Sequence, residues 1–404
     1  MRHWRNGILS VVTALAILLS ACSVLPNAVI HKASPFPSQS APTPSAEQTH
    51  WDKQIQQGIP NEDDTYFIKN MPEEQRSLCI GIYQSIMAFE TEIKFPEPVD
   101  EKTLSNAMWI LSYDCPELFQ ISGDYSYYVR EDIPDQVLSV KPNYILSETE
   151  YKQACEKIQS TLTQWLQDGK WPDAYALEKH IYDQLITSCK YREDGIYSGT
   201  AYGALVLGEA RCEGYSKALC MALRAAGIPS LILTGEAWTI EDGKAAKPEK
   251  HAWNVAKIGD NYYQMDVTWD DSDGVLPMLS SYAYFNLTDS EMYASRSLDE
   301  IYDGLQLPVC NDKQANFYVQ NGTFFSDGID LKKALYDALD AAYERGETLV
   351  LARVETDAQL KELQNNVESW MSGWYRHRRF TSGSYNWTTY DGSRVFCVLD
   401  LNYG

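Results

Sequence analysis

The sequence predicts an α+β protein with three folded parts, preceded by an export signal and an extended tether. Apolar residues at helical spacing alternate with short β-branched runs from residue 51 onward, and 44% of all residues are hydrophobic, enough for a sizeable core. A central stretch also combines one long helix with neighbouring strands. We expect an N-terminal α/β region at 51–146, a central domain at 147–325 and a small C-terminal α/β module at 326–404.

The first 22 residues have the anatomy of a bacterial signal peptide. Arg2 and Arg5 precede an apolar stretch that is too short to span a bilayer. The ending Leu19-Ser20-Ala21-Cys22 resembles a lipobox, in which the cysteine is lipidated and becomes the mature N-terminus. The alternative is an ordinary signal peptide with a chance cysteine. We therefore expect a protein anchored by lipid on the extracytoplasmic face of a bacterial cell membrane, with residues 23–50 as a disordered tether.

Charge and cysteine spacing exclude several classes of function. There are 34 basic and 56 acidic residues, so the formal net charge is −22, and such a surface repels nucleic acid. The eight cysteines after Cys22 are widely spaced and contain no Cys-x-x-Cys pair, which argues against a disulfide scaffold and a zinc site. A metal site formed by Cys212, Cys220 and His251 is a distant alternative. We expect no metal and no cofactor.

The N-terminal region is predicted to contain helices and strands of no assigned function. Apolar spacing and β-branched runs predict helices over Pro72–Glu90 and Leu104–Leu111 and strands over Tyr125–Val129 and Val137–Val140. The central domain then opens with two helices. Ser147 and Glu150 form a capping-box pattern ahead of a helix that runs to about Gln167, and Pro172 is expected to start the next, which ends at Cys189.

A third helix of the central domain begins at a cysteine. Residues 213–226 carry one apolar stripe, and Gly227 is expected to end the helix as a left-handed residue. Cys212 therefore lies at the helix N-terminus, where N–H groups and the helix dipole stabilise a thiolate. Cys220 lies two turns further along and is interpreted as a core or boundary residue. Leu231–Thr234 is a candidate buried strand.

A hairpin follows, and its register can be calculated. His251 to Ala256 and Tyr262 to Trp269 read as two strands joined by Gly259 and Asp260, so paired residue numbers sum to 519. His251 and Asp266 then share one face as a diagonal pair, roughly 7 Å apart at Cβ and within reach of a hydrogen bond. Met265, Val267 and Trp269 are expected on the opposite, apolar face.

A thiol at a helix start, with a histidine and an aspartate on adjacent strands, fits a nucleophile, a general base and an orienting acid for acyl transfer. The local sequences strengthen this interpretation. They are Gly203-Ala204-Leu205-Val206, Arg211-Cys212-Glu213-Gly214-Tyr215-Ser216-Lys217-Ala218, Gly227-Ile228-Pro229, His251-Ala252-Trp253-Asn254 and Asp266-Val267-Thr268-Trp269-Asp270. Over about 175–285, the chain resembles the transglutaminase-like superfamily in its bacterial surface-lipoprotein branch.

The resemblance implies a papain-like α+β core, in which a cysteine helix packs against an antiparallel sheet. It also implies Cys212 as nucleophile, His251 as base and Asp266 as orienting residue, with a thioester intermediate on Cys212. The oxyanion would be held by the Cys212 N–H and a second donor, for which Tyr202 and Gln184 are candidates. Trp253 and Trp269 are candidates for a substrate groove, although strand positions this apolar are more often core.

The last 79 residues are predicted to alternate helix and strand. The expected elements are helices over Ile329–Arg345 and Asp357–Met371 and strands over Leu349–Val354 and Arg394–Leu401. Trp374, Tyr375, Tyr385 and Trp387 are read as exposed aromatics, and either ligand binding or folding would explain them.

Two classes of function remain from the sequence. The first is an extracytoplasmic cysteine enzyme that hydrolyses or transamidates peptide or protein amides, with a cell-wall or surface protein as partner. The second is a non-catalytic surface binding module that retains the same fold. The complete set of Cys212, His251 and Asp266 favours the enzyme.

Overall fold

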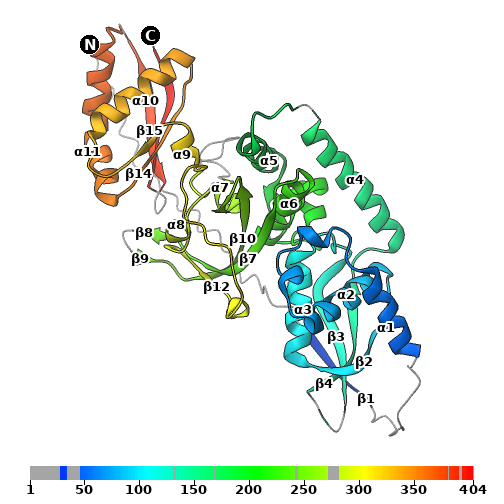
Figure 1. The fold of residues 1–404 in the computed structure, drawn as a ribbon. Helices are drawn as coiled ribbons and strands as arrows, with labels where there is room; N and C mark the ends of the chain where they lie inside the picture. The colour runs from blue at the N-terminus through cyan, green and yellow to red at the C-terminus, as the bar shows by residue number, and fades with distance from the viewer. Residues whose placement is uncertain are drawn as a thin grey trace.

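The computed structural model describes residues 28–33, 46–130, 133, 135–167, 169–241, 244–271, 282–380, 382–390 and 394–403. These residues form a mixed α+β structure with three larger sheets, one in each third of the chain, and the central part lies between the other two (Figure 1). The export signal and Cys22 lie outside the described residues. In the described part of the chain, no helix has both the length and the apolar character needed to cross a bilayer.

The N-terminal part is a four-stranded sheet of order β1-β3-β4-β2 with helices packed on it. Its elements are β1 (Ala28–Ala33), α1 (Ala46–Gln57), α2 (Glu73–Met87), β2 (Ile93–Asp100), α3 (Glu101–Asp114), β3 (Ile121–Arg130) and β4 (Gln136–Tyr144). The predicted helices and strands of this region are confirmed; α2 is shorter than predicted, and α3, β3 and β4 are longer. The tether prediction differs from the structure in two places. Residues 28–33 contain the β-branched residues Val29 and Ile30 and pair in parallel with β3, and residues 46–50 already belong to α1.

The central part begins with a helical layer. Its elements are α4 (Glu148–Leu166), α5 (Ala174–Ser188), β5 (Lys190–Tyr191), the π-helix η3 (Gly203–Leu207), β6 (Glu209–Ala210) and α6 (Cys212–Ala225). The capping box of Ser147 and Glu150 is present. Pro172 does not start α5, because Asp173 is its N-cap and accepts a hydrogen bond from the Ala176 N–H at 2.8 Å. Gly227 has a φ of 77° and follows the end of α6, as predicted.

The central sheet has the order β11-β10-β7-β12, with all neighbours antiparallel. Its elements are β7 (Ser230–Ala237), β10 (Glu249–Ile258), β11 (Asn261–Met265) and β12 (Arg296–Leu298), with β8 (Ile240–Glu241) and β9 (Lys244–Ala245) as a small hairpin. The predicted register is confirmed, since Asn254 pairs with Met265 and Ile258 pairs with Asn261.

One boundary of this hairpin was predicted wrongly. β11 ends at Met265 rather than continuing to Trp269, because the Asp266 side chain accepts a hydrogen bond from the Trp269 N–H and caps the short helix α7 (Val267–Asp270). Met265 and Val267 are buried as expected. Trp269 is not on the opposite face, because its ring lies 5.7 Å from that of His251.

The C-terminal part contains a sheet of order β13-β14-β16-β15 covered by two long helices (Figure 1). After α8 (Asp289–Met292) and α9 (Phe317–Gln320), its elements are β13 (Phe324–Phe325), α10 (Leu331–Arg345), β14 (Val350–Val354), α11 (Asp357–His377), β15 (Ser384–Tyr390) and β16 (Val395–Asn402). Trp374 is not exposed, contrary to the sequence expectation: it is fully buried, and its indole N–H donates to Asp340 at 2.6 Å.

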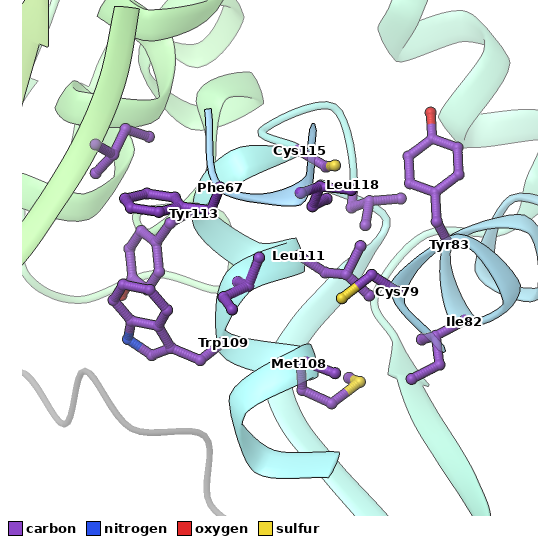
Figure 2. Packing of buried hydrophobic residues seen from close by; sticks show 14 of the residues in the cluster. Phe67, Cys79, Ile82, Tyr83, Met108, Trp109, Leu111, Tyr113, Cys115 and Leu118 are labelled. Carbon is purple, nitrogen blue, oxygen red and sulfur yellow. The ribbon is translucent and has the colours of Figure 1, made fainter. Parts of the chain in front are cut away.

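The N-terminal and central parts share a hydrophobic core. One cluster of buried residues runs from α2 and α3 to β7 and β10, and it includes Trp109, Leu233 and Trp253. In Figure 2, Trp109 and Tyr113 project from the side of α3 that faces the central part, whereas Cys79 and Ile82, which belong to α2, lie on the other side of α3. The N-terminal region is therefore packed against the sheet that carries the candidate site.

Candidate active site

Asp266 lies at the centre of a buried cluster of charged and polar groups. Its Oδ2 accepts hydrogen bonds from His251 Nε2 at 2.7 Å and from Arg296 Nε and Nη2 at 3.1 and 2.5 Å. Its Oδ1 accepts the capping bond from the Trp269 N–H at 3.2 Å. Asp266, His251 and Arg296 are each at most 2% exposed. The predicted hydrogen bond between the histidine and the aspartate is therefore present. His251 lies near the N-terminal end of β10, and Asp266 directly follows β11.

Arg296 was not found from the sequence. It lies on β12, 30 residues beyond Asp266, in a segment with no periodic pattern that would mark it. Its guanidinium carbon lies 4.1 Å from the ring centre of Trp269 and 4.6 Å from that of Tyr284, so two aromatic faces orient the charge. A planar cation held in this way directs two N–H groups at one carboxylate, and here both donate to Oδ2 of Asp266.

A glycine allows β12 to approach β7 closely enough to deliver Arg296. Gly235 on β7 pairs with His251 on one side and with Leu298 on the other. A Cβ at Gly235 would collide with the Ser297 carbonyl oxygen, which is backbone and cannot move independently. The position of β12 therefore depends on the absence of a side chain at 235.

These contacts fix the charge of Asp266 and the tautomer of His251. Burial raises the pKa of a carboxyl group, but the charges of His251 and Arg296 and their hydrogen bonds outweigh burial and lower the pKa of Asp266 to about 2. Asp266 is therefore ionised at neutral pH and only accepts hydrogen bonds, so Nε2 of His251 carries the proton that it shares with Asp266. In the neutral imidazole, Nδ1 is then the basic nitrogen.

Helix α6 runs alongside β10 in the same direction, which brings its first residue to the His251 end of the sheet. The Asn254 Nδ2 of β10 donates to the Ser216 carbonyl at 2.9 Å. One turn later, the Cys220 thiol donates to the Ser230 carbonyl at 3.5 Å, and Ser230 pairs with Ala256. Advancing four residues along α6 thus advances two along β10. Cys212 precedes Ser216 by four residues. It is therefore level with the residues two positions before Asn254, at the end of β10 that carries His251.

Cys212 is the first residue of α6 and is 2% exposed. The side chain of the N-cap residue, Arg211, makes no capping hydrogen bond to this helix. The N–H groups of the first turn and the positive end of the helix dipole therefore act on Cys212. Glu213 bridges Arg211 and Lys217 with two ion pairs of 2.8 Å. Burial raises the pKa of Glu213, yet the Lys217 and Arg211 charges prevail and lower it, so the carboxylate stays ionised beside Cys212.

The remaining predicted residues differ in burial and in their neighbours. Trp253 is fully buried and its indole N–H donates to Gln264 at 2.7 Å, so it belongs to the core and cannot line a groove. Trp269 is half-buried beside His251. Tyr202 stacks on Phe119 at 5.9 Å, and Gln184 lies half-buried on α5. In the described part of the chain, neither Tyr202 nor Gln184 makes a hydrogen bond or ring contact with His251 or Asp266.

The other cysteines are interpreted as structural. Cys220 is fully buried, and burial raises the pKa of its thiol to about 11. All eight cysteines from Cys79 to Cys397 are free thiols. Among the described residues, no three His, Cys, Asp or Glu side chains are grouped to hold a metal ion.

Comparison with known proteins agrees with this geometry. Residues 160–267 match the model of the transglutaminase-like superfamily, a segment that contains Cys212, His251 and Asp266. The chain is thus α+β with a transglutaminase-like core, and the match supports an enzyme of the cysteine acyl-transfer kind. Arg296 lies beyond the matched segment. No curated protein sequence matches the chain.

Solved structures with partial similarity include a proposed cysteine protease from Cytophaga hutchinsonii, at 23% identity and a TM-score of 0.24 over 29% of this chain and 38% of that one. A TGase has 11% identity and a TM-score of 0.25 over 44% and 50%. The periplasmic domain of TgpA from Pseudomonas aeruginosa has 16% identity and a TM-score of 0.23 over 34% and 57%. The present chain therefore covers at most 57% of any of these three chains.

Proposed function

We propose that this protein is a cysteine acyl-transfer enzyme that cleaves or transfers peptide or protein amides through a thioester on Cys212. The observation that carries the proposal is the buried His251–Asp266 pair, completed by Arg296, at the end of the sheet where α6 begins with Cys212. Burying an ionised carboxylate costs free energy unless it is paired with opposite charge and hydrogen bonds. Here the carboxylate is paired with an imidazole, which it can orient and whose protonated form it stabilises.

In the first half of the reaction, His251 Nδ1 accepts the thiol proton and the Cys212 thiolate attacks the amide carbonyl carbon. The C–S bond forms, and the carbonyl oxygen becomes an oxyanion at the N-terminal end of α6, where the helix dipole stabilises negative charge. The C–N bond then breaks, and the amine leaves with the proton from the His251 imidazolium. Asp266, held ionised by Arg296, stabilises that imidazolium.

In the second half, water or a second amine attacks the thioester. His251 Nδ1 takes the proton of the incoming group, the C–S bond breaks, and the Cys212 thiolate is restored. The acyl group leaves as a carboxylic acid with water or as a new amide with an amine. Both reactions use the same catalytic residues, so only the acceptor, water or an amine, distinguishes hydrolysis from transamidation.

We further propose that the enzyme acts outside the cell on cell-wall or surface proteins, held to the membrane by lipid on Cys22. The lipobox-like sequence before Cys22 and the signal-peptide pattern of Arg2, Arg5 and the apolar stretch after them support this location. The acidic surface repels anionic partners.

Product analysis tests the proposal. The purified protein is incubated with a panel of candidate surface peptides and a biotinylated alkylamine, and products are identified by mass spectrometry. We expect peptide cleavage or amine incorporation from the wild type and neither from Cys212→Ser. Cys155→Ser is the matched control, because Cys155 is a free thiol on α4 and should leave product formation unchanged.

Thiol labelling tests the nucleophile without a substrate. Iodoacetamide at about pH 6 should modify Cys212 ahead of the other seven cysteines, since an ordinary thiol with a pKa near 8.5 is mostly protonated there. Cys220 should stay unmodified in the folded protein, because burial raises its pKa to about 11. Equal labelling of the two cysteines, together with no product in the peptide assay, would favour the non-catalytic binding module.

A further inference from the structure

A cavity of about 380 Å³ lies between the N-terminal region and the start of α6. One wall comes from α3, the loop that follows it and the adjoining ends of β3 and β4, and it includes Phe119 and Ile121. The other comes from the loop before η3 and includes Ile196. Arg211 and Glu213 lie on its floor. The cavity therefore combines apolar walls from two parts of the chain with a charged floor.

The cavity begins one residue away from Cys212. Arg211 and Glu213 precede and follow the cysteine, and consecutive Cα atoms are about 3.8 Å apart. A peptide whose carbonyl carbon is attached to the Cys212 sulfur would therefore have its neighbouring side chain within reach of this space. A second cavity of similar volume is lined by residues such as Asp64 and Cys155, and its lining includes neither Arg211 nor Glu213.

Contacts between the floor and the α3 wall fix the position of these two sides of the cavity. Lys217 on α6 donates to the Ser112 hydroxyl of α3 at 3.1 Å, and its ammonium lies 5.2 Å from the centre of the Tyr113 ring. A Cβ at Gly199 would lie 2.6 Å from Arg211 Nη2 and 2.8 Å from Glu213 Oε2, so the space beside the ion pair depends on this glycine. A preformed cavity loses less entropy when it binds a ligand.

One wall of the cavity carries a buried donor without an acceptor. Trp109 lines the cavity, is 1% exposed, and its indole N–H has no hydrogen-bond partner within the described residues. Such a donor is unfavourable until it meets an acceptor. A peptide carbonyl entering with its side chain would supply one.

We propose that this cavity binds an apolar side chain of the acyl donor next to the scissile amide, so that the N-terminal region sets substrate specificity. The proposal rests on the proposed function of Cys212. Among the residues that line the cavity, Arg211 and Lys217 are balanced by the carboxylates Glu213 and Asp124, and the floor lies at the positive end of α6. The positive helix end disfavours a basic side chain, and the apolar residues Phe119, Ile121 and Ile196 favour an uncharged aliphatic or aromatic one.

Chloromethyl ketones test this directly, because the Cys212 thiolate displaces chloride and forms a C–S bond with no further substrate. The probes are the N-acetyl chloromethyl ketones of leucine, glycine and lysine, with chloroacetamide as the reagent that has no side chain. Second-order rates of modification at Cys212 are measured by intact mass and peptide mapping. We expect the leucine probe to exceed the glycine probe by about ten-fold or more, and the lysine probe to show no such gain.

Two variants locate the gain in the cavity. Ile196→Lys places a charge at the wall and Ile121→Trp fills the space; both should reduce the ratio of leucine to glycine rates towards one. Val309→Lys is the matched control, because Val309 is 66% exposed, as Ile196 is 64% exposed, but lines neither described cavity. This variant should keep the wild-type ratio.

The outcomes separate the two proposals. If chloroacetamide does not modify Cys212 in preference to the other cysteines, the proposed function fails. If chloroacetamide modifies Cys212 but leucine and glycine probes react equally, the cavity proposal alone is overturned. The same holds if Ile196→Lys keeps the wild-type ratio, whatever Ile121→Trp does.

Discussion

Replacing Arg296 with methionine should destabilise the central sheet because it leaves the Asp266 carboxylate buried without its cation. Arg296 gives Asp266 two hydrogen bonds, at 3.1 and 2.5 Å, and both residues are at most 2% exposed. Removing one partner of a buried ion pair typically costs about 3–5 kcal/mol. Methionine retains most of the volume between Trp269 and Tyr284, so the loss reports mainly the charge and its hydrogen bonds.

The assay is urea dependence of amide hydrogen exchange in β7 and β10, which reports this sheet even if the three parts unfold in separate steps. Asp266→Asn and the double variant complete a thermodynamic cycle. Because asparagine removes the charge that Arg296 neutralises, the two changes should be coupled by about 2 kcal/mol. Arg345→Met, which breaks an exposed pair with Glu347, should cost at most about 1 kcal/mol.

Additive effects of Arg296→Met and Asp266→Asn, within about 0.5 kcal/mol, would refute this reasoning. A loss of stability in Arg296→Met that is no larger than the loss in Arg345→Met would also refute it. Either result would mean that the charge of Arg296 does not stabilise Asp266 in the folded protein.

Three further outcomes are expected. Gly235→Ala should displace β12 from the Ser297 backbone and lower stability by about 1–3 kcal/mol, whereas Gly123→Ala, with no atom within 4 Å of the new Cβ, should not; urea unfolding measures both. The pKa of Asp266 is about 2 in the folded protein, against 3.8 for an ordinary aspartate. The ionised carboxylate therefore contributes about 2 kcal/mol of stability above pH 4, which is lost as the pH falls through about 2. The free energy of unfolding should consequently fall less steeply with decreasing pH in Asp266→Asn. Cys22→Ala should shift the protein from the membrane fraction to a released or unprocessed form, and equal retention in both would contradict the lipid anchor.

Local patterns in the sequence predicted the elements that carry the site. The apolar stripe ending at Gly227 predicted α6, and the two-residue turn at Gly259 predicted the register of β10 and β11. Both predictions depend only on residues close in the chain. The end of β11 was missed because the capping bond of Asp266 competes with strand pairing at the same residue.

Contacts between distant segments could not be predicted in this way. Lys217 and Ser112 are 105 residues apart, and Arg296 reaches Asp266 across 30 residues from a three-residue strand. A lysine, a serine and an arginine carry no periodicity, so nothing local marks their partners. The cavity beside Cys212 depends on the first of these contacts, and the charge of Asp266 depends on the second.

The position of β12 in the chain has a consequence for the order of folding. Arg296 pairs with Ala237 of β7, yet it is joined to β11 by a stretch of 30 residues after Met265. A nascent chain that ends before residue 296 already contains Cys212, His251 and Asp266 but has no cation for the carboxylate. Loop closure must therefore bring β12 to β7 before the three residues acquire their native electrostatics. The candidate nucleophile, base and acid therefore reach their native electrostatic arrangement only after the strand that follows them in the chain has docked.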